Sequence, residues 1–143
     1  MWKWRDEATV LSELGDPTNA TSYSICVYES GGGLVAAAAA VAAGGSCDSG
    51  DCWAASSSGY RFKDKPALQD GIRAMSLKAS DTPGSASVKV QGSGAQLLFT
   101  SLPLSPSLRV QLVRDDSALC WESLHDLSAI QLNTDQIVRS KTP

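Results

Sequence analysis

Two cysteines that enclose a short polar loop constrain this chain most, in the stretch Cys47-Asp-Ser-Gly-Asp-Cys52-Trp53. A second Cys-Trp step occurs at Cys120-Trp121, and Cys26 lies upstream in an apolar run. Four cysteines are an even count, which favours disulfides when a chain enters an oxidising compartment. The sequence therefore predicts a disulfide-stapled domain that is secreted, extracellular or displayed on the cell surface.

Short segments with alternating apolar and polar residues run through the chain. The clearest are 23–28, 60–63, 87–91 and 108–112, and this alternation is the period of half-buried strands. Turn residues separate them, for example at 30–33, with the spacing typical of a sandwich or barrel. We expect an all-β fold, an antiparallel β-sandwich (Ig-like or jelly-roll-like) of about seven to nine short strands.

An alanine-rich run at residues 34–43 is ambiguous by composition. Alanine is the best helix former, but so short a segment makes a marginal helix. The strands expected on either side favour a strand here. The run is also too short to span a bilayer as a helix, which takes about 20 residues.

The length of 143 residues fits one domain. We assign residues 1–143 to a single β-sandwich domain with a C-terminal tail from about residue 126. The charged start at 1–7 does not resemble a signal peptide. We expect a fragment or module of a longer secreted protein, or a chain whose signal was removed.

The formal net charge is −3, and the basic residues are scattered along the sequence apart from a weak cluster at Arg61, Lys63 and Lys65. Phosphate binding needs clustered Lys and Arg, so nucleic acid is not expected as a partner. An anionic membrane surface is disfavoured for the same reason. Neither membrane insertion nor a cofactor is predicted.

Strand parity suggests how the cysteines pair. Neighbouring residues of a strand point to opposite faces, so a buried Trp121 places Cys120 outside, and Cys26 lies opposite Ile25 and Val27. Our hypothesis is that Cys26 and Cys120 bridge on the outer face of one sheet while Cys47 and Cys52 close their own loop. Four cysteines permit three pairings, so connectivity stays open.

Two chemical alternatives use His125, the only histidine. Cys47-x4-Cys52 and Cys120-x4-His125 together offer the thiolates and imidazole of a tetrahedral zinc site. Alternatively, His125 could act as the base of a small secreted hydrolase, with Asp126 or Glu122 as its acidic partner. The chain has no Gly-x-Ser-x-Gly elbow, and His125 reads more simply as a surface residue near a strand end.

Aromatic residues also have two interpretations. A sugar-stacking platform is one use for Trp2, Trp4, Trp53, Tyr60 and Phe62. However, Trp2 and Trp4 share a strand face, as do Tyr60 and Phe62, which is typical of a core stripe. We therefore predict that these side chains belong to the core.

Several landmarks occur together, in an order that resembles a known kind of domain. They include Trp2-Lys-Trp4, Cys52-Trp53, Gly59-Tyr-Arg-Phe-Lys-Asp-Lys65 and Cys120-Trp-Glu122. This order resembles a recurrent Cys/Trp-containing β-domain of secreted or surface proteins of bacteria, especially proteobacteria, with no assigned activity. The resemblance implies export and a β-rich module, and it places the alanine run as a strand in the hairpin after Tyr28. This chain has alanines there where mixed aliphatic residues are usual.

These observations together favour a non-catalytic extracellular β module with a structural, adhesive or carbohydrate-binding role. Its expected partners are a glycan or a cell-surface protein. The alternatives are the small secreted hydrolase that uses His125 and the zinc-stabilised Cys/His module.

Overall fold

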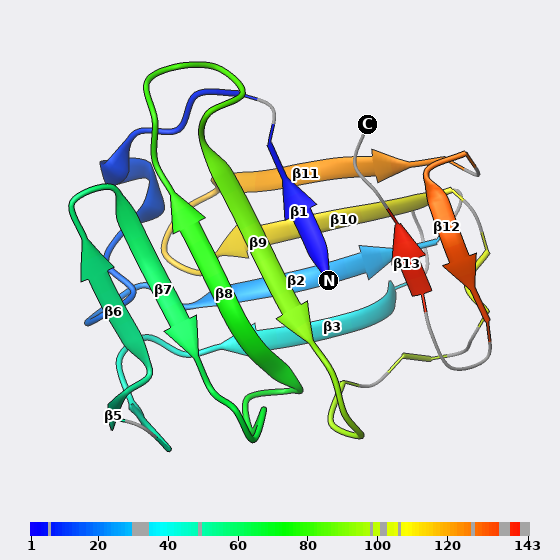
Figure 1. Ribbon diagram of the computed structural model, residues 1–143, viewed down its shortest axis with the longest axis horizontal. Helices are drawn as coiled ribbons and strands as arrows, with labels where there is room; N and C mark the ends of the chain where they lie inside the picture. Colours follow the sequence, from blue (N-terminus) through cyan, green and yellow to red (C-terminus); the bar gives the residue numbers. More distant parts are fainter. Residues whose placement is uncertain are drawn as a thin grey trace.

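The structure is a computed structural model, and its described residues form two antiparallel sheets packed face to face (Figure 1). The residues described are 1–5, 7–29, 35–48, 50–97, 99–100, 103–105, 107–126, 128–134 and 138–140. The all-β sandwich expected from the sequence is confirmed. The turn predicted at 30–33 lies outside the described residues.

The first sheet has five strands in the order β1-β9-β8-β7-β6. Every neighbouring pair is antiparallel, and the bounds are β1 Trp2–Trp4, β6 Trp53–Ser56, β7 Gly59–Lys63, β8 Ile72–Lys78 and β9 Ser87–Gly92. Consecutive strands β6 to β9 form a meander, and the N-terminal strand β1 adds to the β9 edge.

The second sheet has four strands in the order β11-β10-β2-β3. Their bounds are β2 Tyr23–Tyr28, β3 Val35–Val41, β10 Leu108–Arg114 and β11 Cys120–His125. The alanine-rich run is the edge strand β3, so the strand prediction for it is confirmed. Figure 1 shows the strands of this sheet running across those of the first.

Shorter elements lie outside these two sheets. A 3-10 helix η1 covers Leu11–Leu14, and two small hairpins pair β4 Ser46–Cys47 with β5 Gly50–Asp51 and β12 Ile130–Asn133 with β13 Val138–Ser140. Among the described residues the sandwich itself thus contains nine strands, within the predicted range, and the hairpins add four more.

The core lies between the two sheets and is rich in aromatic side chains. Trp53 is the centre of this cluster, with ring centroids 5.7 Å from Tyr23 and 5.2 Å from Phe62. Trp2, Trp4 and Phe62 are also buried, which confirms the core interpretation for them. Tyr60 is only partly buried and packs against the same cluster.

The predicted Cys26–Cys120 bridge is not formed; both cysteines are free thiols. The prediction that both cysteines lie on the outer face of the sheet is correct. Cys26 pairs with Gln111 and Cys120 with Val113, and these two residues of β10 face outward. However, β10 separates β2 from β11, which puts the two cysteines about 10 Å apart across the sheet. A disulfide needs Cα atoms within about 7 Å, so the strand order prevents this pairing.

Candidate functional site

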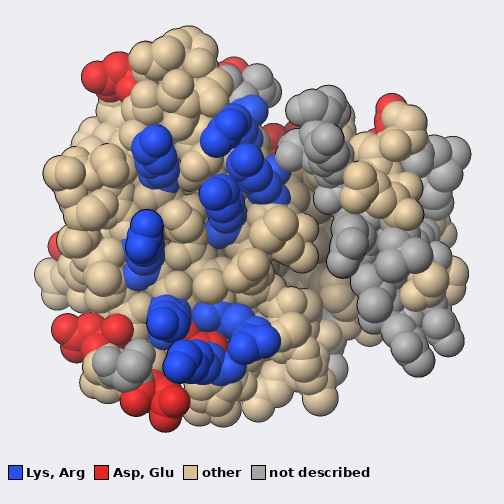
Figure 2. Space-filling model, viewed as in Figure 1, with Lys and Arg blue, Asp and Glu red and all other residues tan. Residues whose placement is uncertain are grey.

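Basic side chains gather on the outer face of the five-stranded sheet. Figure 2 shows this face, with Lys and Arg side chains over β1, β9, β8 and β7. We define the basic face by six residues, half of the 12 Lys and Arg in the chain: Lys3, Arg5, Arg61, Lys63, Lys78 and Lys89. An acidic protein thus carries a locally basic surface.

The strand register explains why these residues meet. On each strand the core residues alternate with outward ones, for example Val88 and Val90 with Lys89. Lys3 is the direct partner of Lys89, Lys89 of Ser76, and Ser76 of Arg61. One row across four strands therefore carries three cationic side chains.

No acidic side chain stands in the outward positions of this sheet. Within the part of the chain that the structure describes, Arg5, Arg61, Lys63, Lys78 and Lys89 form no ion pair. The neighbouring Arg5 charge, partial burial and the Lys89 charge, in decreasing order, lower the pKa of Lys3. Like charges directly opposite each other destabilise a sheet, so this arrangement does not serve stability.

The same face is hollowed. An open depression of about 590 Å³ is lined on one side by Asp51, Cys52 and Ala54 and elsewhere by side chains of the sheet, including Arg61, Lys63, Ser76, Lys89 and Gln91. Its volume is in the range of small-molecule and sugar sites. Guanidinium and ammonium groups are suited to anions, and the Ser76 hydroxyl and Gln91 amide can hydrogen-bond a polar ligand.

Sequence reasoning missed this site because its residues are spread from position 3 to position 89. Only the pairing of β1 with β9 and the β7–β9 meander bring them together. The available signal was the alternation itself: each cation lies next to a core residue within a strand, as Lys3 does between Trp2 and Trp4.

His125 is placed inside the sandwich rather than on the surface. It is 1% exposed on β11, and its Nε2 lies 2.9 Å from Ser123 Oγ on the same strand face. Trp2 Nε1–H donates to Ser123 Oγ at 2.6 Å from β1. The three side chains thus form a hydrogen-bond chain that joins the edge strands of the two sheets.

Neither proposed acidic partner completes a catalytic triad with His125. Glu122 points to the opposite, outer face of β11, where its carboxylate accepts a hydrogen bond from the Gln111 side-chain amide. Asp126 accepts hydrogen bonds from Ser128 Oγ and the Ala129 backbone N–H, which lower the pKa of its carboxyl.

The cysteine loop is closed as expected: Cys47 and Cys52 form a disulfide. Their sulfurs are therefore bonded to each other, so the zinc arrangement expected as an alternative is not formed. Among the described residues, no cluster of three or more His, Cys, Asp or Glu side chains could hold a metal ion.

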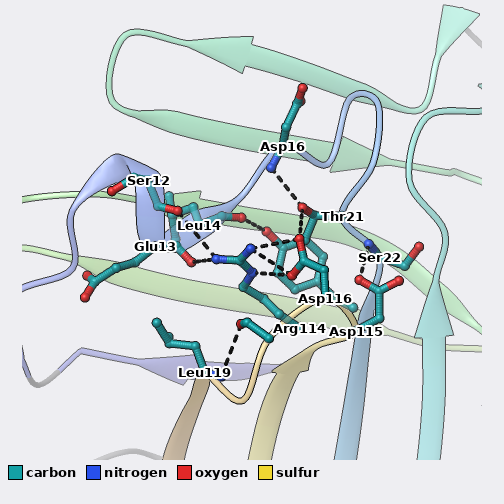
Figure 3. Close-up of polar contacts among 12 residues, drawn as sticks. Ser12, Glu13, Leu14, Asp16, Thr21, Ser22, Arg114, Asp115, Asp116 and Leu119 are labelled. Atoms are coloured by element: carbon teal, nitrogen blue, oxygen red, sulfur yellow. Dashed lines mark hydrogen bonds and ion pairs between the residues drawn. The ribbon is translucent and has the colours of Figure 1, made fainter.

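A polar network fastens helix η1 to the end of β10 (Figure 3). Arg114 donates to the Glu13 carbonyl at 2.7 Å and forms a two-point contact with Asp116 at 2.8 Å for each bond. Thr21 Oγ1 also donates to Asp116 Oδ2, and these hydrogen bonds hold the pKa of the Asp116 carboxyl below its usual value. The Arg114 and Thr21 donors are all bonded to a backbone carbonyl or to the Asp116 carboxylate, which indicates a structural role.

Fold and site together define a disulfide-closed antiparallel β-sandwich with one basic, hollowed sheet face. No protein family, curated protein or solved structure matches the chain. Among the described residues, no helix has the length and apolar character to cross a membrane.

Proposed function

We propose that this chain is a non-catalytic, extracellular β-sandwich module that binds carbohydrate through the outer face of the five-stranded sheet. It would act as an adhesive or carbohydrate-binding part of a larger secreted protein. The observation that carries this proposal is the depression of about 590 Å³ on an exposed sheet face, bordered by cationic and polar side chains. The Cys47–Cys52 disulfide supports an oxidising location.

The arrangement of possible catalytic groups supports a binding role. The strongest catalytic pair is Ser123 and His125, at 2.9 Å. A serine nucleophile needs an open approach for its substrate and donors for the oxyanion. Here Ser123 faces the core, its hydroxyl accepts from the Trp2 indole, and His125 is buried. The two polar groups stabilise the packing of β1 against β11.

A steric variant tests the proposed binding face without changing its charge. Ser76 points into the depression from β8, so Ser76→Tyr fills it. The matched control is Ala38→Tyr, an exposed strand position on the outer face of the other sheet. We expect the unmodified protein to bind polysaccharides on a glycan array, Ser76→Tyr to lose that binding and Ala38→Tyr to keep it. Absence of glycan binding, or equal loss in both variants, contradicts the proposal.

The hydrolase remains the competing function, because Ser123 and His125 are hydrogen-bonded. Its test is turnover of ester, glycoside and peptide substrates by the purified protein. We expect none. Turnover that disappears in both Ser123→Ala and His125→Ala, with folded protein by circular dichroism, would establish the hydrolase instead.

A further inference from the structure

We propose that the ligand of the basic face is an acidic polysaccharide, recognised through its carboxylate or sulfate groups. This inference rests on the proposed carbohydrate-binding function and specifies its substrate class. It is carried by charge complementarity: five cations and no carboxylate occupy the outward positions of the sheet, and the sixth cation, Arg5, follows directly after β1.

The spacing of the cations suits a polymer with separated charges. Neighbouring strands are about 4.8 Å apart, so the row Lys3–Lys89–Ser76–Arg61 spans about 14 Å. Along each strand, outward positions recur about every 7 Å, as for Arg61 and Lys63. Acid groups borne on successive or alternate sugar rings match such a grid.

Nucleic acid fits the same face less well. Duplex DNA presents one charge about every 1.7 Å of its axis, a much denser array than this face offers. Single strands are held by exposed aromatic rings on which bases stack. Of the aromatic residues of this sheet, Trp2, Trp4, Trp53 and Phe62 are instead buried in the core, and Tyr60 is partly buried against it.

A membrane surface also fits less well. Proteins that lie on membranes insert exposed apolar side chains among the lipids. Of the large hydrophobic residues that the structure describes as exposed, only Met1 belongs to this face. The depression is concave, and a flat bilayer cannot enter it.

Hydrogen-bonding groups within the depression complete the recognition. Arg61 presents a planar fork that matches a carboxylate, and Lys89 and Lys63 are point charges beside it. Ser76 lies between Lys89 and Arg61, and Gln91 follows Lys89 on the same face of β9; both are suited to sugar hydroxyl groups. Asp51 borders the depression near β5 and repels acid groups from that end, so the chain is expected to lie toward β1 and β9.

The test uses one polymer in a charged and a neutral form: polygalacturonate and its fully methyl-esterified counterpart. We expect the protein to bind the acidic form at least roughly tenfold more tightly in 50 mM salt, with affinity that falls as salt rises. Arg61→Gln and Lys89→Gln should each weaken binding several-fold and reduce the salt dependence by about one charge. The control Arg109→Gln removes one charge from the other sheet and should bind like the unmodified protein.

Each alternative result overturns a distinct statement. Equal binding of both polymers that Ser76→Tyr abolishes would leave the carbohydrate function intact and refute the charge inference. Binding of neither polymer, nor of any sulfated polysaccharide, refutes this inference, and the glycan array then decides the proposed function separately. Tighter binding to single-stranded or duplex DNA, or to phosphatidylserine vesicles, at the same salt would replace the polysaccharide as ligand.

Discussion

Lys3 on β1 and Lys89 on β9 are direct cross-strand partners on the outer face of the five-stranded sheet. Their two ammonium charges repel each other. The Arg5 charge, partial burial and the Lys89 charge, in decreasing order, lower the pKa of Lys3. A position that carried only a structural role would favour an opposite charge or a neutral side chain.

Removing one of these charges should stabilise the fold. We expect Lys89→Gln to raise the melting temperature at low ionic strength, because the repulsion with Lys3 is lost, while ligand binding weakens. The gain should disappear near 1 M salt, where the Debye length is about 3 Å. Thermal melts at several salt concentrations measure it.

The matched control for this effect is Lys65→Gln, the same charge change at an exposed loop position outside the strand pairs. Its melting temperature should change less than that of Lys89→Gln. If Lys89→Gln is destabilised equally at all salt concentrations, repulsion is not the cause.

The features that the sequence predicts well are those that depend on neighbouring residues. Alternation predicted that a buried Trp121 places Cys120 outside, and it put Trp2 and Trp4 in the core, as the structure confirms. This works because side-chain direction in a strand follows from a period of two along the chain.

Features that depend on strand order were not predictable from this pattern. The Cys26–Cys120 bridge failed because β10 inserts between β2 and β11, a pairing between distant segments. The basic face was missed for the same reason, since Lys3 and Lys89 meet only after β1 joins β9. Alternation tells which face a residue occupies, but not which strand lies beside it.

Tyr23 makes the stability of the fold depend on pH in the alkaline range. Its hydroxyl donates to the Leu14 carbonyl within the core, and burial raises its pKa well above that of a free tyrosine. The unfolded chain therefore loses this proton first, at about pH 10. The contribution to stability is full below that pH and is lost as pH rises above it.

We expect Tyr23→Phe to cost about 1–3 kcal/mol of unfolding free energy at pH 7, because the buried Leu14 carbonyl loses its donor. Between pH 9 and 11 the variant should lose less stability than the unmodified protein. Urea unfolding of both proteins at pH 9 and at pH 11 measures this difference. Tyr60→Phe is the control, since Tyr60 is only partly buried on β7. Parallel alkaline losses in the unmodified protein and Tyr23→Phe would contradict the assignment.

The cysteines should behave as one bridge and two thiols. Alkylation and peptide mapping under non-reducing conditions should link Cys47 to Cys52 and label Cys26 and Cys120. Reduction should lower stability by about 2 kcal/mol, the chain-entropy value for so short a loop.

The double variant Cys26→Ser with Cys120→Ser provides the control for reduction. It should retain both the bridge and the same response to reductant, because these thiols lie two strands apart. A linked Cys26–Cys120 peptide in the folded protein would require a different strand order.

The outer edge of β3 is covered in two parts. Phe99 and Thr100 pair with Ala36 and Ala37, and two side chains from the loop between β7 and β8 cover the end of the strand. The Ala40 N–H donates to Asp70 Oδ2 at 2.9 Å and the Ala42 N–H to Gln69 Oε1 at 2.8 Å. Open edge groups pair with other chains, and an alanine-rich strand offers little steric resistance to such pairing. These two side chains therefore protect the Ala40–Ala42 part of this edge from pairing with another chain.

Removing both caps should increase aggregation more than it lowers stability. Asp70 has a φ of 47°, so glycine is the replacement that avoids backbone strain. We expect Gln69→Ala with Asp70→Gly to aggregate faster by light scattering at 37 °C, with a loss of unfolding free energy of about 1 kcal/mol for each exposed hydrogen bond. Asp70→Asn keeps an oxygen acceptor for the Ala40 N–H and should scatter like the unmodified protein. If the double variant remains monomeric for as long as Asp70→Asn, the edge is protected by something other than these caps.

If aggregation does accelerate, replacing Ala38 by Lys in the same double variant should suppress it, because a charged side chain on β3 opposes edge pairing.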